Sequence, residues 1–409
     1  MEQIVTNRTD DDLYKFSMAQ AVFHNYTDAW ARYEFTCRAK DLDLSAHLLE
    51  IKEQIYAMNG MGFDGVTLLK MGKKLPFLKS DFLHYLNNSK LNTGFVDIYN
   101  SNSNGGIDIV IEGPWLDTIW FEVHILSIIS EIYVRDQLVK LGISMDQAIE
   151  NAKKRYEEKI RNAMKKYDLL TYPNFADFGT RRRASLALQR EMLSFLKNHS
   201  FKLCVGTSNV MLGLENDMKI IGTMAHEWIM AHAGFTRFDL SQKMALNVWQ
   251  KEYRDQLGIA LTDTYTTDFF LKDFDGLLAK SYSGVRQDSG NPIEVGYKFI
   301  RHYENLGIDP MTKQIVFSDS LNFDKIVMLQ KQFKDKIQTG FGIGTNLMND
   351  IGFNVKPLNA VIKMTAIKYG NDIWYPTIKL SDSLGKSMCK DKEYSEFIQK
   401  VVRTKVEKE

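Results

Sequence analysis

One histidine stands in a context where an imidazole could carry out chemistry. His226 and Glu227 occur in the segment GTMAHEW, where helical spacing begins, in a chain with only 8 histidines. A zinc site of the HExxH type is excluded, because Met230 takes the place of the second histidine. An isolated histidine is more often a core residue bonded to a backbone carbonyl. At a predicted active face, His226 is instead expected to act as a general base or as a nucleophile toward a phosphoryl group.

A glycine-rich segment after a predicted strand could bind phosphate. The segment is GFGIGTN, which contains Gly342, Gly344 and Thr345. Successive backbone N–H groups in such a loop can converge on phosphate oxygens without any net charge. Neither the dinucleotide-binding spacing nor the lysine of a P-loop is present. Taken alone, the segment is equally compatible with a tight turn in which the glycines need positive φ.

Acidic residues follow other predicted strands. Asp288 occurs in GVRQDSGNP beside Arg286, and Asp319 occurs in SDSLN. Such carboxylates could hold ribose hydroxyls or Mg²⁺, which prefers one or two carboxylates together with substrate oxygens, and Arg286 could bind a phosphate. The alternative is a plain turn in which the aspartate caps a helix, and Asp263 in LTDTYTT is open to the same two interpretations.

Three consecutive arginines occur in DFGTRRRAS, at the expected start of a helix. Cations there oppose the helix dipole, which an anionic ligand would offset. Phe178 lies just before Arg181 and adds a flat apolar surface beside the charge, a pairing that suits a small aromatic acid. A solvated basic face is an equally good interpretation of the arginines alone.

The polar clusters share one position in the predicted secondary structure. From residue 170 onward, short apolar runs that end in Gly, Ser, Thr or Asp alternate with stretches of helical spacing. This alternation predicts parallel βαβ units, and about seven units over ~180 residues favour an α/β barrel. In a barrel, the loops after the strands form one face, where chemistry takes place. The clusters are therefore predicted to share one site.

The first part of the chain mixes both patterns. Helices are expected at 10–25, 70–91 and 145–167, and strands at 31–38 and 107–113.

Two further segments complete the predicted elements. The most apolar stretch, 115–130, is interrupted by charged residues and is interpreted as a buried core helix. Strand-like runs at 355–385 are expected to return to the N-terminal domain, and the last ten residues are expected to form a frayed helix.

Composition excludes several classes of function. Lys+Arg number 52 and Asp+Glu 51, so no long-range field would collect nucleic acid or an anionic membrane. No apolar run is long enough to span a bilayer. Three separated cysteines, Cys37, Cys204 and Cys389, suit the reducing cytoplasm rather than a disulfide framework.

The motifs taken together resemble those of a known family. They occur in the order DLYKFSM, DFGTRRRAS, GTSNV, GTMAHEW, DTYTTDFF, GVRQDSGNP, SDSLN and FGIGTN, over nearly the whole chain. This series is similar to that of the bacterial nicotinate phosphoribosyltransferases, which are type II phosphoribosyltransferases. The resemblance implies an N-terminal α/β domain (1–140), an irregular α/β barrel (141–355) and a C-terminal segment (356–409) whose strands complete the N-terminal domain. It also implies a homodimer with shared active sites.

The resemblance implies a reaction as well. Nicotinate, phosphoribosyl pyrophosphate (PRPP), ATP and water would give nicotinate mononucleotide, pyrophosphate, ADP and phosphate, with Mg²⁺ as cofactor, as the first step of NAD synthesis from nicotinate. The nearer alternatives are a nicotinamide or quinolinate phosphoribosyltransferase. A metal-dependent barrel hydrolase of phosphosugars and a non-catalytic nucleotide sensor are alternatives from other classes.

Residue roles follow from the resemblance, motif by motif. His226 is expected to be phosphorylated by ATP, with Arg286 and Asp288 as further catalytic residues and Asp288 as a metal ligand. Nicotinate is expected to lie between Phe178 and a partner subunit's Tyr14. The expected residues for the substrate carboxylate and phosphates are Arg181, Arg286, Asp319, Asn322, Gly342, Gly344 and Thr345.

One further position bears on substrate selectivity, and the role of another is left open. Ser208 stands where related nicotinamide enzymes have an aspartate, and the absence of that carboxylate favours an acidic substrate. Glu227 stands where some relatives have serine, so its role is left open.

Overall fold

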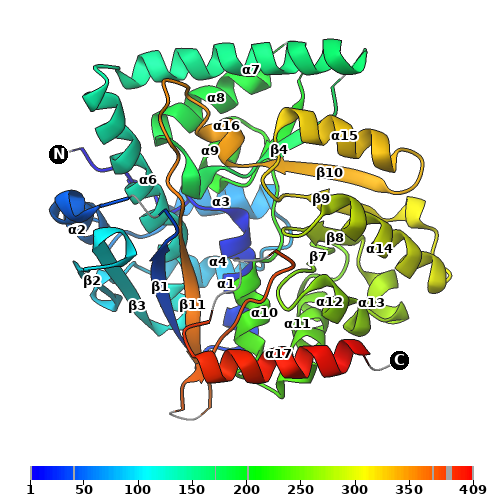
Figure 1. Cartoon of the computed structure of the whole chain (residues 1–409). Coiled ribbons are helices and arrows are strands. Elements are labelled where there is room, and N and C mark those ends of the chain that lie inside the picture. The colour runs from blue at the N-terminus through cyan, green and yellow to red at the C-terminus, as the bar shows by residue number, and fades with distance from the viewer. Residues whose placement is uncertain are drawn as a thin grey trace.

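Two β-sheets organise the chain, one antiparallel and one parallel. The antiparallel sheet lies on one side of the molecule in Figure 1, and most helices of the parallel unit lie on the other. This computed structural model describes residues 2–39, 42–170, 172–199, 202–370, 373–383 and 389–407.

The antiparallel sheet joins the two ends of the chain. Its order is β12-β11-β1-β3-β2, and its strands are β1 (Trp30–Cys37), β2 (Val96–Asn100), β3 (Ile107–Pro114), β11 (Ala360–Lys368) and β12 (Tyr375–Pro376). β11 pairs with β1 from Trp30↔Lys368 to Cys37↔Ala360. The expected return of the C-terminal strands to the N-terminal sheet is therefore confirmed, although residues 371–372 and 384–385 of the expected segment lie outside the described residues.

The parallel sheet is a curled, open barrel. Its order is β6-β5-β4-β10-β9-β8-β7, and its strands are β4 (Phe175–Asp177), β5 (Cys204–Thr207), β6 (Lys219–Ile220), β7 (Ile259–Leu261), β8 (Gly284–Gln287), β9 (Gln314–Phe317) and β10 (Gln338–Ile343). The last strand, β10, pairs with both β4 and β9. The predicted irregular α/β barrel is confirmed.

The barrel is open between β6 and β7 in the part of the chain that the structure describes. The chain between these strands forms α10 (His226–His232) and α11 (Phe238–Tyr253). His226 is thus the first residue of a helix placed at the opening of the barrel, beside the loops that follow the strands.

Two expected helices are each divided. The segment 70–91 forms α3 (Gly65–Lys74) and α4 (Ser80–Asn88), because Pro76 has no N–H and disfavours a helical residue before it. The apolar stretch at 115–130 forms a single turn, α5 (Trp115–Thr118), followed by α6 (Phe121–Lys140). α6 is buried over its first half as expected, since a helix that is apolar on all sides must be covered on all sides.

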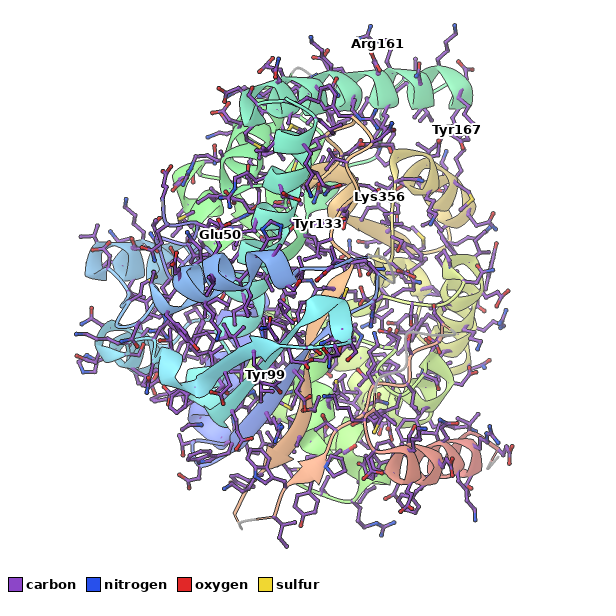
Figure 2. The ribbon with its side chains drawn as sticks, turned by 60° about the vertical axis from the view of Figure 1, so that its left-hand side comes forward. Glu50, Tyr99, Tyr133, Arg161, Tyr167 and Lys356 are labelled. Atoms are coloured by element: carbon purple, nitrogen blue, oxygen red, sulfur yellow. The ribbon has the colours of Figure 1, made fainter. Side chains whose placement is uncertain are left out.

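The remaining helices cover the two sheets. The expected helix at 10–25 is α1 (Leu13–Asn25), and α7 (Met145–Tyr167) lies outermost, where Arg161 points away from the protein in Figure 2. The C-terminal tail forms a helix as expected, α17 (Lys392–Glu407), but this helix packs on the barrel rather than fraying, with Lys405 bonded to Asp273 at 2.6 Å. Residues 408–409 of the expected tail lie outside the described residues. The other helices are α2 (Leu48–Tyr56), α8 (Leu186–Asn198), α9 (Val210–Glu215), α12 (Thr267–Asp273), α13 (Gly276–Ser281), α14 (Pro292–Asn305), α15 (Phe323–Phe333) and α16 (Thr345–Met348). Among the described residues, none of the helices has the length and apolar character needed to cross a bilayer.

Candidate active site

A histidine and two aspartates meet where the barrel strands end. Nε2 of His226 lies 3.0 Å from Oδ1 of Asp263, which follows β7, and 3.8 Å from Oδ2 of Asp288, which follows β8. Ser289 donates to Oδ2 of Asp263 at 2.6 Å, and Ser318 donates to Oδ1 of Asp288 at 2.8 Å. The sequence placed all three ionisable residues at strand ends, and the barrel brings them together.

A lysine that the sequence pattern did not single out completes this cluster. Nζ of Lys379 lies 2.8 Å from Nε2 of His226 and 3.1 Å from Oδ2 of Asp263. It comes from the C-terminal segment beyond β12, whose sequence IKLSD reads as part of a strand. No local signal identifies such a residue, because only the fold places it over the barrel.

The surroundings keep the imidazole neutral. Burial, followed by the charge of Lys379, lowers the pKa of His226 to about 4. Burial would raise the pKa of Asp263, but nearby His226 and Lys379 outweigh it and hold that pKa well below its ordinary value. A neutral imidazole beside a carboxylate retains a lone pair, which a base or a nucleophile requires.

The three consecutive arginines have separate environments. They precede α8 and lie in or just after a single 3₁₀ turn (Thr180–Arg182), so the expectation that they begin a helix is wrong. Arg183 is fully buried and Arg181 donates to Glu122 at 3.2 Å, which rules out a solvated basic face. Burial, followed by the like charges of Arg181 and Arg38, lowers the pKa of Arg182 to about 10.

Arg181 connects the arginines to both halves of the site. Burial would lower its pKa, but the nearby Tyr14, Glu122, Asp12 and Asp288 raise that pKa above its ordinary value. Arg38, which follows β1, was not predicted as a site residue. Burial, followed by the like charge of nearby Arg181, lowers the pKa of Arg38.

Gly342 in β10 and Gly344 just after this strand are needed for close packing rather than for an unusual turn. Neither Gly342 nor Gly344 has positive φ, so the alternative of a turn that needs it is wrong. A Cβ on Gly342 would lie 2.2 Å from the ring of Phe178, and one on Gly344 would lie 3.0 Å from the carbonyl oxygen of Phe178. Both glycines therefore let β10 approach Phe178, and Thr345 follows as the first residue of α16.

Replacement of Gly342 by alanine is expected to displace the Phe178 ring. A shift of about 1 Å in a substrate-positioning group can cost on the order of 10²-fold in kcat/KM. The matched control is Gly340→Ala in the same strand, where the nearest atom is the flexible end of Gln314 at 3.0 Å. Steady-state kinetics with the expected substrate, nicotinate, test the prediction, and equal effects of the two substitutions would contradict it.

The N-terminal segment reaches the barrel of its own chain. Ser208 donates to Oδ1 of Asp12 at 2.6 Å, and the backbone N–H of Leu13 donates to the Ser208 carbonyl at 2.8 Å. Tyr14 is next in sequence and lies near Arg181, and burial raises the pKa of its hydroxyl well above the ordinary value, so this hydroxyl is uncharged. A tyrosine from the same chain therefore lies at the site, whereas sharing of sites between subunits stays a prediction.

A mixing experiment separates the two arrangements. If each chain uses its own Tyr14, a Tyr14→Ala variant mixed with a His226→Asn variant is expected to show no more activity than the sum of the two. The mixture is to be unfolded and refolded together before the assay, so that subunits can exchange. Activity well above the sum would show that a partner supplies the tyrosine.

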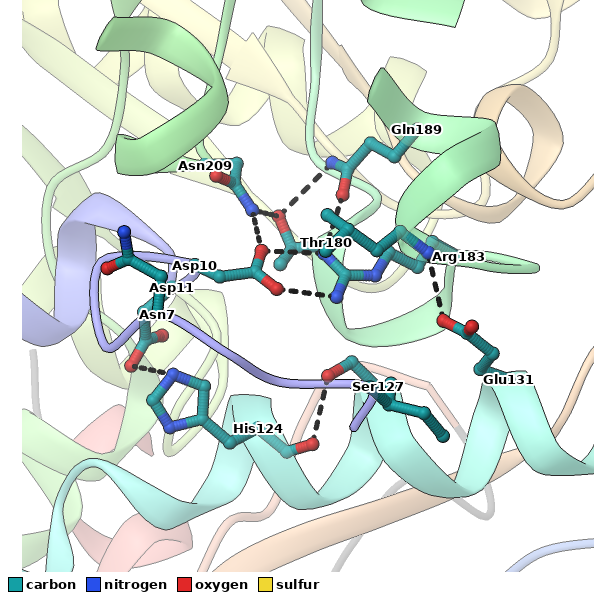
Figure 3. Close-up of polar contacts among 12 residues, drawn as sticks. Asn7, Asp10, Asp11, His124, Ser127, Glu131, Thr180, Arg183, Gln189 and Asn209 are labelled. Atoms are coloured by element: carbon teal, nitrogen blue, oxygen red, sulfur yellow. Dashed lines mark hydrogen bonds and ion pairs between the residues drawn. The ribbon is translucent and has the colours of Figure 1, made fainter. Parts of the chain in front are cut away.

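Polar contacts behind the site fasten this segment. Arg183 donates to both carboxylate oxygens of Asp10, at 2.7 and 2.6 Å, and Asn209 donates to Oδ1 of the same residue at 2.7 Å. Figure 3 shows this group beside the pair formed by Asp11 and His124, whose Oδ2 and Nε2 atoms lie 3.8 Å apart. The position of the residues before α1 is therefore fixed by the barrel.

Glu227 has a structural environment. Its carboxylate accepts from Lys15 at 2.6 Å, from Tyr33 at 2.6 Å and from Trp115 at 2.7 Å. Lys15 also contacts Glu122 at 2.9 Å, and Glu122 in turn contacts Arg181. Through Tyr33, Glu227 links α10 to β1 of the antiparallel sheet.

The last predicted residues lie near the same edge. Asp319 follows β9 and accepts from Ser320 at 3.0 Å. Asn322 is exposed and caps α15 by accepting from the N–H of Lys325 at 2.9 Å. Arg286 donates to the carbonyl of Met224 at 3.2 Å, while its Nε is buried and has no hydrogen-bond partner among the described residues.

The carboxylates differ in their capacity for a metal ion. His226, Asp263 and Asp288 each offer a ligand atom within 4.8 Å of the others. Both oxygens of Asp263 are already occupied by His226, Ser289 and Lys379. Asp288 is partly exposed and, among the described residues, accepts one hydrogen bond, from Ser318, so it fits Mg²⁺ bound mainly by substrate oxygens.

Comparison with known proteins identifies the family to which the chain belongs. Residues 174–406 match the nicotinate phosphoribosyltransferase (NAPRTase) family, and residues 9–130 match its N-terminal domain. A nicotinate phosphoribosyltransferase of Ectopseudomonas mendocina is 42% identical over 403 residues, 98% of each chain. The chain belongs to the nicotinate phosphoribosyltransferase family. The predicted family is thereby confirmed.

Solved structures of the nicotinate phosphoribosyltransferase family share the fold. That of the Porphyromonas gingivalis protein has a TM-score of 0.89 at 30% identity, covering 98% of this chain and 100% of that one. That of the Vibrio cholerae protein has a TM-score of 0.89 at 34% identity, covering 97% and 93%. The nicotinate phosphoribosyltransferase match spans both the segment with Tyr14 and the segment with Lys379.

Proposed function

We propose that the chain transfers the phosphoribosyl group of PRPP to nicotinate, giving nicotinate mononucleotide and pyrophosphate. One observation carries the proposal: a neutral, buried His226 and the partly exposed Asp288 lie in one site with Arg181, beside Phe178. These groups match the parts of the reaction, which needs a place for an aromatic acid, cations for phosphate groups and a phosphoryl acceptor.

The nicotinate ring would lie against Phe178, with Tyr14 close by. Arg181 is about one-third exposed on its side chain and has only Glu122 as a direct partner among the described residues, so it can also bind the substrate carboxylate. The pyridine nitrogen then attacks C1 of the ribose, the bond from C1 to the pyrophosphate oxygen breaks, and pyrophosphate leaves with the electron pair. The nitrogen is already nucleophilic and needs only alignment.

The cations of the site would stabilise PRPP and the leaving pyrophosphate. Burial, followed by the like charge of Arg181, lowers the pKa values of Arg38 and Arg182, and an anionic ligand beside these arginines relieves the repulsion among them. Preorganised charges of this kind stabilise the developing negative charge in a transition state. Asp288 would hold the ribose hydroxyls or Mg²⁺, which supplies further neutralisation of the pyrophosphate when bound.

ATP would act through His226. An imidazole nitrogen attacks the γ-phosphorus, the bond to the bridging oxygen breaks and ADP leaves. Water later cleaves the N–P bond and releases phosphate. The phosphorylated ring carries about −1.5 to −2 charges, and we propose that this charge reorders the surrounding cations and tightens binding of PRPP.

A pyrophosphate-release assay tests the function. Release from PRPP is expected only when nicotinate is present, and ATP is expected to increase it. Comparable release with nicotinamide or quinolinate would favour those enzymes, and turnover of PRPP without any base would favour a hydrolase. Binding of PRPP without release would favour a sensor.

Substitution of Ser208 by aspartate tests the selectivity argument. The new carboxylate would lie against Asp12, whose pKa burial already raises, so it would repel an anionic substrate. We expect kcat/KM for nicotinate to fall on the order of 10²-fold, with a smaller loss for nicotinamide. Ser208→Ala is the control for loss of the hydrogen bond, and an unchanged ratio between the two substrates would remove Ser208 from the argument.

A further inference from the structure

Arg182 differs from its two neighbours in sequence because it has no ionic partner. Its side chain is partly buried and makes no hydrogen bond or ion pair with any described residue, whereas Arg181 and Arg183 each contact a carboxylate. Burial, followed by the like charges of Arg181 and Arg38, lowers the pKa of Arg182 to about 10. A partly buried cation without a partner destabilises the ligand-free protein. An anionic ligand would offset this cost.

The guanidinium group of Arg182 lies within reach of the acidic residue that follows β8. The charge of Asp288 acts to raise the pKa of Arg182, against the effects of burial and of the other arginines. Asp288 is the residue proposed above to hold the ribose hydroxyls or Mg²⁺. Arg182 is therefore suited to bind a phosphate group attached to the same sugar.

The arginine turn, residues 179–183, is held at both ends. At its start, a Cβ on Gly179 would lie 2.6 Å from Cγ of Met348, so the turn packs closely on α16. At its end, the guanidinium group of Arg183 donates to Asp10, which Figure 3 shows. A short turn that is fixed only at its ends can still rotate its central peptide groups, so the middle of the turn needs a contact of its own.

Asn349 supplies a contact to the middle of the arginine turn. The residue is 3% exposed, and its amide nitrogen donates to the carbonyl oxygen of Arg182 at 2.9 Å. Its backbone N–H donates to the carbonyl of Thr345 at 2.9 Å and so closes the single turn of α16, which follows the glycine-rich segment. One buried side chain therefore ties the peptide group after Arg182 to the segment that would bind phosphate.

The side chain of Asn349 is only half satisfied. Its oxygen Oδ1 is buried and has no hydrogen-bond partner among the described residues. A buried acceptor that is left unpaired costs stability, and most buried polar atoms in proteins are paired. The hydrogen bond from the amide nitrogen to Arg182 is what the site gains from an asparagine at this position.

We infer that Asn349 is a positioning residue, which fixes the peptide group of Arg182 so that the guanidinium group of Arg182 can bind a phosphate group of PRPP. The inference rests on the proposed function, because it takes PRPP as the substrate. Asn349 acts through Arg182 and needs no contact with substrate for this role.

Asn349→Leu retains the shape of the side chain and removes its hydrogen bond to Arg182. KM for PRPP is expected to rise on the order of 10- to 10²-fold, because a displaced binding group loses its alignment with the substrate. kcat is expected to change less than about threefold, because the lost contact acts on binding. The matched control is Asn151→Leu: the amide nitrogen of Asn151 also donates at 2.9 Å to a backbone carbonyl of this segment, that of Ile351, which lies outside the arginine turn.

A double-mutant cycle tests whether Asn349 acts through Arg182. Arg182→Met is expected to raise KM for PRPP at least as much as Asn349→Leu, while the melting temperature of the ligand-free protein stays the same or rises, because the cation has no partner to lose. The double variant is expected to stay within about twofold of Arg182→Met alone. Losses that multiply in the double variant would overturn the inference, as would a wild-type KM for PRPP in Arg182→Met.

Calorimetric binding of pyrophosphate gives a measurement that does not depend on turnover. Its affinity is expected to fall on the order of tenfold in both Asn349→Leu and Arg182→Met, because each loses or displaces a charged donor, and to be unchanged in Asn151→Leu. A wild-type affinity in Asn349→Leu, or equal losses in Asn349→Leu and Asn151→Leu, would overturn the inference. Failure of the proposed function gives a different result, since the wild-type protein would then release no pyrophosphate from PRPP and nicotinate.

Discussion

Replacement of His226 by asparagine is expected to abolish ATP hydrolysis and the phosphorylated form of the protein. The ring is the only group in the described site with a neutral nitrogen lone pair beside a carboxylate, and asparagine supplies hydrogen bonds but no nucleophile. The loss of ATP turnover is expected to reach at least about 10³-fold. Some ATP-independent release of pyrophosphate is expected to remain, because Arg181 and Asp288 are retained.

Incorporation of the γ-phosphate of labelled ATP into acid-labile phosphoprotein measures this effect. His84→Asn, in an exposed position on α4, is the control for the substitution itself. Continued ATP turnover in His226→Asn at a rate near that of the wild type would show that another residue accepts the phosphoryl group. Loss of both reactions with an unchanged melting temperature would instead make His226 part of the transfer step.

Replacement of Lys15 by methionine is expected to have the largest effect on stability. The ammonium group is fully buried and contacts Glu227 at 2.6 Å and Glu122 at 2.9 Å. In the variant, the buried carboxylates of Glu227 and Glu122 lose this cation. Breaking a buried ion pair in this way costs about 3–5 kcal/mol. Because Glu122 also orients Arg181, we expect KM for nicotinate to rise as well.

Chemical denaturation and steady-state kinetics measure the two effects. Lys73→Met, on the exposed face of α3, is the control. The double variant Lys15→Met with Glu227→Gln is expected to recover part of the lost stability, because it removes one of the uncompensated charges. Absence of any difference between the single and double variants would show that the two residues do not stabilise each other.

The sequence located most elements and most acidic or basic residues of the site. Strand ends are visible as apolar runs that stop at small polar residues, so the positions of His226, Asp263 and Asp288 along the chain are enough to place them at one face. The same patterns failed at Pro76, where one expected helix is two, and at the C-terminus, where α17 packs on the barrel. At 70–91 a single proline decided the outcome, and at the C-terminus tertiary contacts decided it.

Roles that depend on contacts between distant segments could not be derived from local pattern. Glu227 follows His226 directly, yet its partners are Lys15, Tyr33 and Trp115. The glycine at 342 reads as a turn, whereas its function is to admit the ring of Phe178. The pattern gives the type of a side chain and its place on an element, but not the neighbour across the core.

By itself, the sequence determined the barrel, the family and the series of polar residues that follow the strands, because these depend on periodicity and short motifs within continuous segments. Only the tertiary structure decided that Lys379 reaches His226, that Tyr14 lies at the site of its own chain and that Arg183 holds Asp10. Each of these contacts joins residues more than 150 positions apart. Such pairs are set by how whole elements pack, and a hydrogen bond or ion pair that spans them leaves no periodic trace in the chain.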